Sequence, residues 1–293
     1  MTTKKFIPPS ELIITPRGSI YHLDVHPTEL ATTIITVGDP QRVERVSRHF
    51  DRLEHRLQHR EFVTHTGWIG SKRLSVIGTG IGPDNIDIVI NEADALHNID
   101  FDTRYPKENH TKLTFIRIGT SGSLHADIPV DAWVASSHGL GLDNLLAYYA
   151  GSDGFFTEGK RLCGEVVLPV SPYLVAGDET LRTHFSGPAV HTGITATSPG
   201  FYGPQGRQLR LEPKMQVTDL LRDVIYGGHR ITNFEMETAA IYGLARLSGH
   251  RALSLNAILA NRLANTFSPD PARAIDLLIT YTLERLEDLP DQL

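Results

Sequence analysis

Short runs of apolar and β-branched residues recur along the chain and predict buried strands. Most runs are continuous rather than alternating, which is typical of strands covered on both faces. They lie at 33–37, 74–79, 113–119, 133–137, 190–196 and 253–260. Between them, apolar positions recur every three or four residues, as in amphipathic helices. This spacing predicts helices around Val43, Val46 and Phe50 and at 85–97, 236–247 and 272–286.

Strands that alternate with helices indicate an α/β fold in which helices flank a central sheet. The composition is that of an ordinary globular protein, since 40% of the 293 residues are hydrophobic and 21% are charged. No Pro-rich, Ser/Gly-rich or single-charge run separates two halves. We therefore expect residues 1–293 to form a single domain.

Charge and cysteine usage restrict the partners and the compartment. A formal net charge of -6 argues against a general basic surface, so we expect neither nucleic acid nor a membrane as partner. The single Cys163 excludes an internal disulfide, and the stretch from Met1 to Phe6 leads into prolines rather than an apolar signal core. These features predict a cytoplasmic protein.

Glycines with hydroxyl or acidic neighbours follow three predicted strands, at Gly38-Asp39, Gly78-Thr79-Gly80 and 119–122. Ligands of such sheets bind beyond the carboxyl ends of the strands. At the first turn, Gly38 permits close backbone approach and Arg42 supplies a positive charge near a helix start, which suits an anion. A capped helix with a surface arginine is the alternative.

Arg117 interrupts an apolar strand, where a charge is costly unless it is paired or binds a ligand. The Thr120 hydroxyl and the glycine-rich backbone after the strand favour an anion site. A buried structural salt bridge is the competing interpretation.

The turn from Gly78 to Pro83 does not indicate a dinucleotide, because the third glycine of that fingerprint is missing. We interpret it as a substrate loop. His55 and His59 are four residues apart, but no further ligand completes a zinc pattern. We expect no metal and no cofactor.

The loop from Phe201 to Arg207 carries an amide and a guanidinium two residues apart. Gln205 offers donors and an acceptor, and Arg207 offers a rigid fork of donors. Together they match the carbonyl, N–H and carbonyl edge of uracil. An exposed turn with two solvated side chains is the alternative.

Glu235 and Glu237 flank Met236 at the predicted start of the helix at 236–247. Acidic residues favour helix starts, which would explain both structurally. A carboxylate beside a sugar-sized cavity can also bind both hydroxyls of a vicinal diol. Glu237 is the candidate for that role.

Together, these motifs resemble the nucleoside phosphorylase family with a single α/β domain, and within it the uridine phosphorylases. The resemblance covers most of the chain and implies a three-layer sandwich whose mixed, partly barrel-like sheet is flanked by helices. The motifs, in family order, are Tyr21-His22-Leu23, Gly38 to Arg42, His59-Arg60-Glu61-Phe62, Gly80-Ile81-Gly82-Pro83, Arg117 to Gly122, Phe201 to Arg207, Phe234 to Glu237 and Asn261-Arg262-Leu263.

The resemblance also implies a role for each site residue. The phosphate-binding residues would be Gly38, Arg42, Arg117 and Thr120, with Arg60 reaching a neighbouring subunit's site. The uracil-binding residues would be Phe201, Gln205, Arg207 and Arg262. The ribose-binding residues would be Met236 and Glu237, with His22 acting across the subunit interface. The catalytic residues would be Arg117, Gln205, Arg207 and Glu237. The chain would then form a homo-oligomer, at least a dimer, with residues 1–30 packing at an interface.

The implied activity is phosphorolysis of uridine to uracil and ribose 1-phosphate, for pyrimidine salvage or catabolism, with inorganic phosphate as co-substrate. Deoxyuridine and thymidine are further candidate substrates. Purine-cleaving relatives carry a Ser-Asp pair where this chain has Asn261-Arg262, which disfavours a purine nucleoside phosphorylase and a purine nucleosidase. A broad-specificity nucleoside phosphorylase or nucleosidase on the same fold stays open as the alternative. A hydrolytic nucleosidase and a non-catalytic nucleoside-binding protein stay open, although neither needs Arg42, Arg60 and Arg117.

Overall fold

The computed structural model describes residues 5–290. The strands are β1 (Thr33–Val37), β2 (Arg52–His59), β3 (Phe62–Ile69), β4 (Lys72–Gly78), β5 (Ile99–Asp100), β6 (Tyr105–Pro106), β7 (Thr114–Ser123), β8 (Trp133–Gly141), β9 (Tyr173–Ala176), β10 (Val190–Thr197), β11 (Ile225–Tyr226), β12 (His229–Glu235), β13 (Arg251–Asn261) and β14 (Thr266–Phe267). The helices are α1 (Pro40–Ser47), α2 (Pro83–Asn98), α3 (Asp153–Cys163), α4 (Glu179–His184), α5 (Val217–Leu221), α6 (Thr238–Leu247) and α7 (Pro271–Glu287), with single 3₁₀ turns η1 (Leu145–Tyr148) and η2 (Gly203–Gln205).

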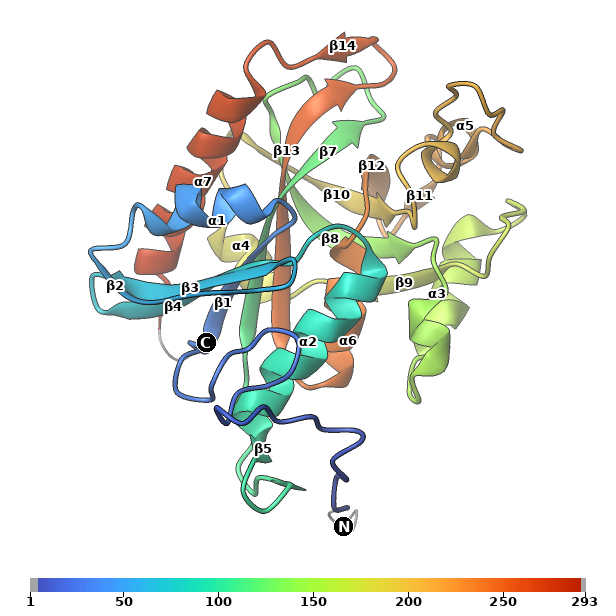
Figure 1. The fold of residues 1–293 in the computed structure, drawn as a ribbon. Coiled ribbons are helices and arrows are strands. Elements are labelled where there is room, and N and C mark those ends of the chain that lie inside the picture. Colours follow the sequence, from blue (N-terminus) through green and yellow to red (C-terminus); the bar gives the residue numbers. More distant parts are fainter. Residues whose placement is uncertain (1–4, 291–293) are drawn as a thin grey trace.

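One large mixed sheet organises the molecule (Figure 1). At its centre β1 lies parallel between β4 and β7, and β7 runs parallel to β13. β13 then pairs antiparallel with β8, and β8, β10 and β12 follow in parallel. Because β12 returns to pair with β7, this half closes into a barrel. The other half stays open and ends in the antiparallel strands β3 and β2.

Helices cover both faces of the open half, which gives three layers. Ile34 of β1 and Phe115 of β7 pack in a cluster with α2 and α6. Their neighbours Ile35 and Ile116 point to the opposite face and pack with α1 and α7. All four side chains are fully buried. This two-sided burial explains the continuous apolar runs of the sequence.

The predicted fold is confirmed. Each apolar run overlaps a strand, namely β1, β4, β7, β8, β10 or β13, and each helical repeat overlaps α1, α2, α6 or α7. The predicted start of α6 is wrong, because β12 extends through Glu235 and the helix begins at Thr238. From the end of the strand, the Glu235 carboxylate accepts hydrogen bonds from the N–H groups of Glu237 and Thr238, both at 2.9 Å. It thereby satisfies amides at the helix start that have no partner within the helix.

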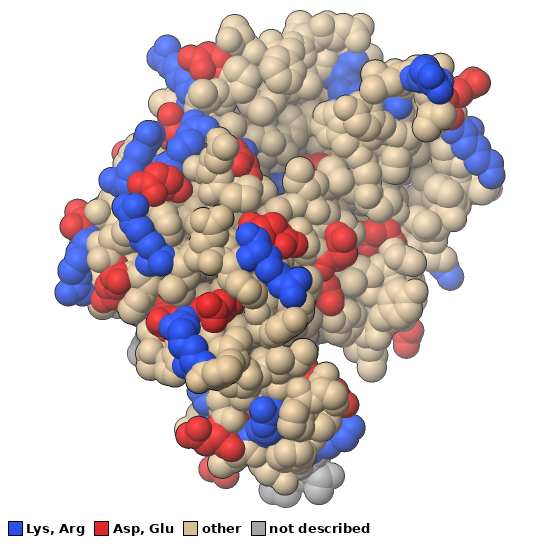
Figure 2. Space-filling view, in the orientation of Figure 1, with Lys and Arg blue, Asp and Glu red and all other residues tan. Residues whose placement is uncertain are grey.

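The described part of the segment before β1, residues 5–32, packs against the core, with Leu12, Ile20 and Leu23 buried in the same cluster as α2. Its packing on a neighbouring subunit stays a prediction. Residues 1–4 of the predicted interface segment 1–30 lie outside the described residues. Within residues 5–290, no helix combines the length and apolar character needed to cross a bilayer. On the face seen in Figure 2, basic and acidic side chains are interspersed rather than segregated.

Candidate active site

A cavity of about 700 Å³ opens at the carboxyl ends of β1, β4 and β7. Its size suits a small molecule such as a nucleoside. The predicted site residues that line it are Gly38, Arg42, Arg117, Thr120, Phe201, Gln205, Arg207, Met236 and Glu237. The fold thus brings residues from four separate motifs to one cavity, at the edge of the sheet that the sequence indicated.

Arg42 lines the cavity from the first turn of α1. Asp39 caps this helix by accepting the N–H of Gln41 at 2.9 Å, and Pro40 opens it. Arg42 is 7% exposed and donates from Nη1 to the Ile118 carbonyl at 3.1 Å. Its buried Nε has no hydrogen-bond partner within residues 5–290. The pKa of Arg42 is lowered to about 10, mainly because the side chain is buried and secondly because the positive charge of Arg117 is nearby. An anion beside both arginines would relieve this unfavourable setting.

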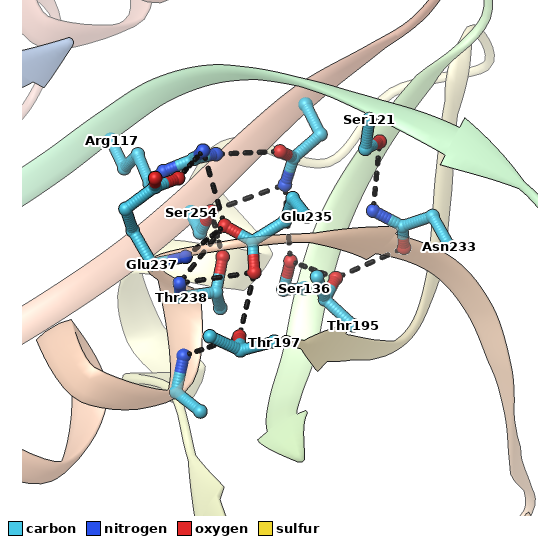
Figure 3. Close-up of polar contacts among 12 residues, drawn as sticks. Arg117, Ser121, Ser136, Thr195, Thr197, Asn233, Glu235, Glu237, Thr238 and Ser254 are labelled. Atoms are coloured by element: carbon cyan, nitrogen blue, oxygen red, sulfur yellow. Dashed lines mark hydrogen bonds and ion pairs between the residues drawn. The ribbon is translucent and has the colours of Figure 1, made fainter. Parts of the chain in front are cut away.

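Arg117 is buried on β7 between two carboxylates and an amide (Figure 3). Its Nη1 donates to Asn256 Oδ1 at 2.6 Å, and its Nη2 donates to Glu237 Oε2 at 2.5 Å. Nη2 also lies 3.1 Å from Glu235 Oε2. The structural salt bridge named as an alternative therefore exists. Because Arg117 also lines the cavity, the ion pair does not exclude contact with a bound anion.

Both glutamates beside Arg117 have their carboxylate oxygens engaged by the protein, but with different partners. Glu235 accepts from the Thr197 hydroxyl at 2.6 Å in addition to the amides at the start of α6, so its oxygens are occupied by the protein itself. Glu237 Oε1 accepts the N–H of Gly82 at 2.9 Å. Burial raises the pKa of Glu237, and the charge of Arg117 opposes that rise. Glu237 is thus held in the cavity wall between Arg117 and the turn that follows β4.

The loop from Phe201 to Arg207 also lines the cavity, through Phe201, Gln205 and Arg207. It turns through η2 and the left-handed Gly206, whose φ is 68°. Gln205 is 2% exposed, and its Oε1 accepts from Arg207 Nη1. The Arg207 guanidinium stacks 3.8 Å from the centre of the Phe201 ring. The loop is therefore not an exposed turn with two solvated side chains. Burial and the nearby charge of Arg262 lower the pKa of Arg207 to about 10.

Arg262 lies behind this loop rather than in the cavity lining. Its Nη1 donates to the carbonyl of Gln205, and its Nη2 donates to the carbonyl of Gly206 at 3.4 Å. The Arg262 backbone is itself fixed by a hydrogen bond from its N–H to the Ser123 carbonyl at 3.0 Å, at the end of β7. Arg262 thus joins the loop to the barrel strands.

Residues 32–274 match the family model of the Phosphorylase superfamily. The chain belongs to this superfamily.

Named members resemble the chain over most of its length. A uridine phosphorylase of Thermococcus kodakarensis is 32% identical over 281 residues, which cover 95% of this chain and 90% of that protein. A DeoD-type purine nucleoside phosphorylase of Listeria welshimeri is 27% identical over 237 residues, covering 80% and 84%. The crystal structure of a Trypanosoma brucei nucleoside phosphorylase, described as showing uridine phosphorylase activity, has a TM-score of 0.82 at 27% identity and covers 95% of this chain and 100% of that one.

Like Arg262, two further residues that the family resemblance assigned to the site, Arg60 and His22, lie outside the cavity lining of their own chain. Arg60 occupies the β2–β3 turn with a φ of 53°, and its Nη2 donates to the Tyr21 hydroxyl at 3.1 Å. His22 Nδ1 lies 2.6 Å from Glu92 Oε1, and the His22 carbonyl lies 3.0 Å from His59 Nδ1. These contacts tie Arg60 and His22 to the same stretch of surface.

One group of described residues has donor atoms close enough for a metal: Asp94, His110 and His250, within 4.8 Å of one another. His250 Nδ1 accepts the N–H of Leu113 at 3.2 Å, so the ring proton is on Nε2, which lies 3.0 Å from Asp94 Oδ1. A metal on Nε2 would displace that proton from a satisfied hydrogen bond. We assign no metal to this group.

The residues that hold Arg117 in place were missed by the sequence analysis. Asn256 lies within the apolar run of β13, and Glu235 was interpreted only as an acid at a helix start. Ser121, which lines the cavity, accepts from Asn233 Nδ2 at 2.9 Å. The available signal was a polar side chain in an apolar strand, the same signal that singled out Arg117, because a buried polar group requires a partner.

Proposed function

We propose that this chain cleaves uridine by phosphorolysis, with inorganic phosphate as co-substrate, giving uracil and ribose 1-phosphate. The observation that carries the proposal is a single cavity lined both by the buried Arg42 and Arg117 and by the Gln205–Arg207 pair. Glu237 lies in the wall beside the arginines. The uridine phosphorylase of Thermococcus kodakarensis, similar over 95% of the chain, supports the same conclusion.

In this proposal phosphate binds between the backbone of Gly38, the two guanidinium groups of Arg42 and Arg117, and the Thr120 hydroxyl. The unpaired Nε of Arg42 would donate to a phosphate oxygen. The arginines position the phosphate for attack on the sugar carbon that bears the base. Its negative charge also favours the partly cationic sugar ring of the transition state.

The base and the sugar would occupy the remaining length of the cavity. Phe201 packs on the uracil ring, while the free donors of Gln205 and Arg207 meet the charge that develops on uracil as it leaves. Met236 and Glu237 hold the ribose, with the carboxylate accepting from its hydroxyls. The reaction requires no cofactor, no metal and no covalent enzyme intermediate.

We further propose that the active unit is a homo-oligomer, at least a dimer, in the cytoplasm. Arg60 and His22 would reach the phosphate and the ribose 5′-hydroxyl of a neighbouring cavity, which is consistent with their absence from the lining of their own. Arg262 would act on the base through the loop carbonyls that it binds.

The test is uracil release from uridine with and without inorganic phosphate, with deoxyuridine, thymidine and inosine assayed beside it. We expect cleavage of uridine that depends on phosphate. Cleavage without phosphate would mean a hydrolase, faster cleavage of inosine would mean a purine enzyme, and binding of uridine without cleavage would mean a non-catalytic nucleoside-binding protein.

A further inference from the structure

Arg117 reaches its partners only because its side chain runs back over its own strand. A β-carbon at Gly119, two residues further along β7 on the same face, would lie 1.6 Å from Arg117 Nη1. The absence of that carbon lets the guanidinium lie flat against the sheet. It then meets the neighbouring strand β13, where Asn256 is paired with Gly119 in the strand register.

Asn256 is 0% exposed, and each end of its carboxamide is committed. Oδ1 accepts from Arg117 Nη1 at 2.6 Å, whereas Nδ2 donates to the Ser254 hydroxyl at 3.1 Å and the Ser136 hydroxyl at 3.4 Å. A guanidinium only donates, so Arg117 fixes which end of the amide faces it. The hydroxyls of Ser254 and Ser136 then act as acceptors for Nδ2 at the other end of the amide. The guanidinium of Arg117 is thereby held at Nη1 by the amide and at Nη2 by the carboxylates.

The neutrality of this partner bears on anion binding. The buried charges here are the cations of Arg42 and Arg117 and the carboxylates of Glu235 and Glu237, which balance. An amide at position 256 orients Arg117 without cancelling more of its charge. A third carboxylate would make this end of the cavity anionic and would repel a phosphate.

We infer that Asn256 is the positioning residue that aims Arg117 at phosphate and keeps the phosphate end of the cavity electrically neutral before binding. This inference rests on the proposed function. It assigns to Asn256 no contact with substrate, so its effect should appear in the affinity for phosphate more than in the affinity for uridine.

Two substitutions of Asn256 separate its effect on the orientation of Arg117 from its effect on the charge of the cavity. Asn256→Ala removes the acceptor for Arg117, and Asn256→Asp keeps an acceptor of the same shape while adding charge. At pH 8 we expect the KM for phosphate to rise about tenfold in Asn256→Ala and further in Asn256→Asp, with the KM for uridine rising less than about threefold. Asn98→Asp is the matched control, because Asn98 is also buried but lies at the end of α2, outside the cavity lining.

Calorimetric titration of inorganic phosphate into the full-length variants without nucleoside gives the same comparison independently of catalysis. Weaker phosphate binding in both Asn256 variants, with a normal Asn98→Asp, supports the inference. A phosphate affinity within about twofold of the unsubstituted protein in both variants, or an equal rise in the two KM values, would overturn it. Normal phosphate affinity in Asn256→Asp alone would overturn the charge argument. Release of uracil without phosphate by the unsubstituted protein would contradict the proposed function itself, and this result is distinct from any outcome for the Asn256 variants.

Discussion

At the scale of single residues, a charge within an apolar strand was an informative signal. Arg117 had to have a partner or a ligand, and the structure places it against Glu237, Glu235 and Asn256. The identity of these partners was beyond the sequence, because Asn256 lies 139 positions from Arg117 along the chain. Contacts at that separation are set by strand order, which no local pattern encodes.

Substitution of Gly119 tests directly whether Arg117 must keep its position to bind phosphate. In Gly119→Ala the added methyl group would occupy the place of the Arg117 guanidinium, so the arginine must leave its ion pairs. We expect kcat/KM for phosphate to fall at least about 100-fold, as for loss of an oriented charged donor. Steady-state kinetics with varied phosphate would measure this.

Gly154→Ala is the control for that substitution. Gly154 lies in α3, and a β-carbon there meets no atom within 4 Å. This variant should keep its activity and melt at an equal or slightly higher temperature, because alanine favours the helix. Unchanged phosphate kinetics in Gly119→Ala would show that Arg117 has no part in binding phosphate.

Substitution of Arg207 should impair the use of uridine rather than the binding of phosphate, the reverse of the effect expected for Gly119→Ala. Arg207→Ala removes the donors proposed for uracil and leaves Arg42 and Arg117 in the cavity lining. We expect turnover of uridine to fall by about 100-fold, or ~3 kcal/mol in transition-state stabilisation, with phosphate binding retained. Calorimetric titration with phosphate beside the uridine assay would test this, and a fully active variant would contradict the assignment of the base pocket.

At the scale of elements, the turns after strands were predicted better than the starts of helices. The glycine turn at Gly38 was placed correctly because a strand, a proline and a capping Asp39 follow one another in the sequence. The start of α6 was misplaced because acids favour a helix start without specifying its first residue. Glu235 satisfies the helix amides from the last position of β12, which only the folded backbone reveals.

The loop from Phe201 to Arg207 depends on one cross-link for its position. Arg262→Ala would remove both bonds to the carbonyls of Gln205 and Gly206. We expect the KM for uridine to rise about tenfold and the KM for phosphate to stay unchanged, since hydrogen bonds from a charged donor contribute about 1.5–3 kcal/mol. Arg210→Ala removes the same charge from an exposed position nearby and should leave both KM values unchanged. A normal uridine KM in Arg262→Ala would mean that the loop holds its shape without this residue.

At the scale of the whole molecule, the sequence predicted the layers but not the way in which the sheet closes. Two-sided burial marks β1, β7 and β13 as continuous apolar runs, which local patterns record. Closure depends on β12 pairing with β7 and on β13 pairing antiparallel with β8. These are long-range pairings between segments whose own patterns do not name a partner. The barrel-like sheet therefore came from the family resemblance rather than from periodicity.

The proposed oligomer can be tested through the separation of Arg60 from the cavity of its own chain. Arg60→Ala and Arg207→Ala should each form an oligomer with little activity, since each site would lack one of the two arginines. In a dimer, subunit exchange in an equal mixture makes half of the molecules hybrid, and one of the two sites in each hybrid combines an intact Arg207 with the partner's intact Arg60. We expect activity to recover to about a quarter of that of the unsubstituted protein. If Arg60 served its own cavity, no site in any hybrid would be intact. An exchanged mixture, verified by mass, that stays inactive would therefore refute action across the interface.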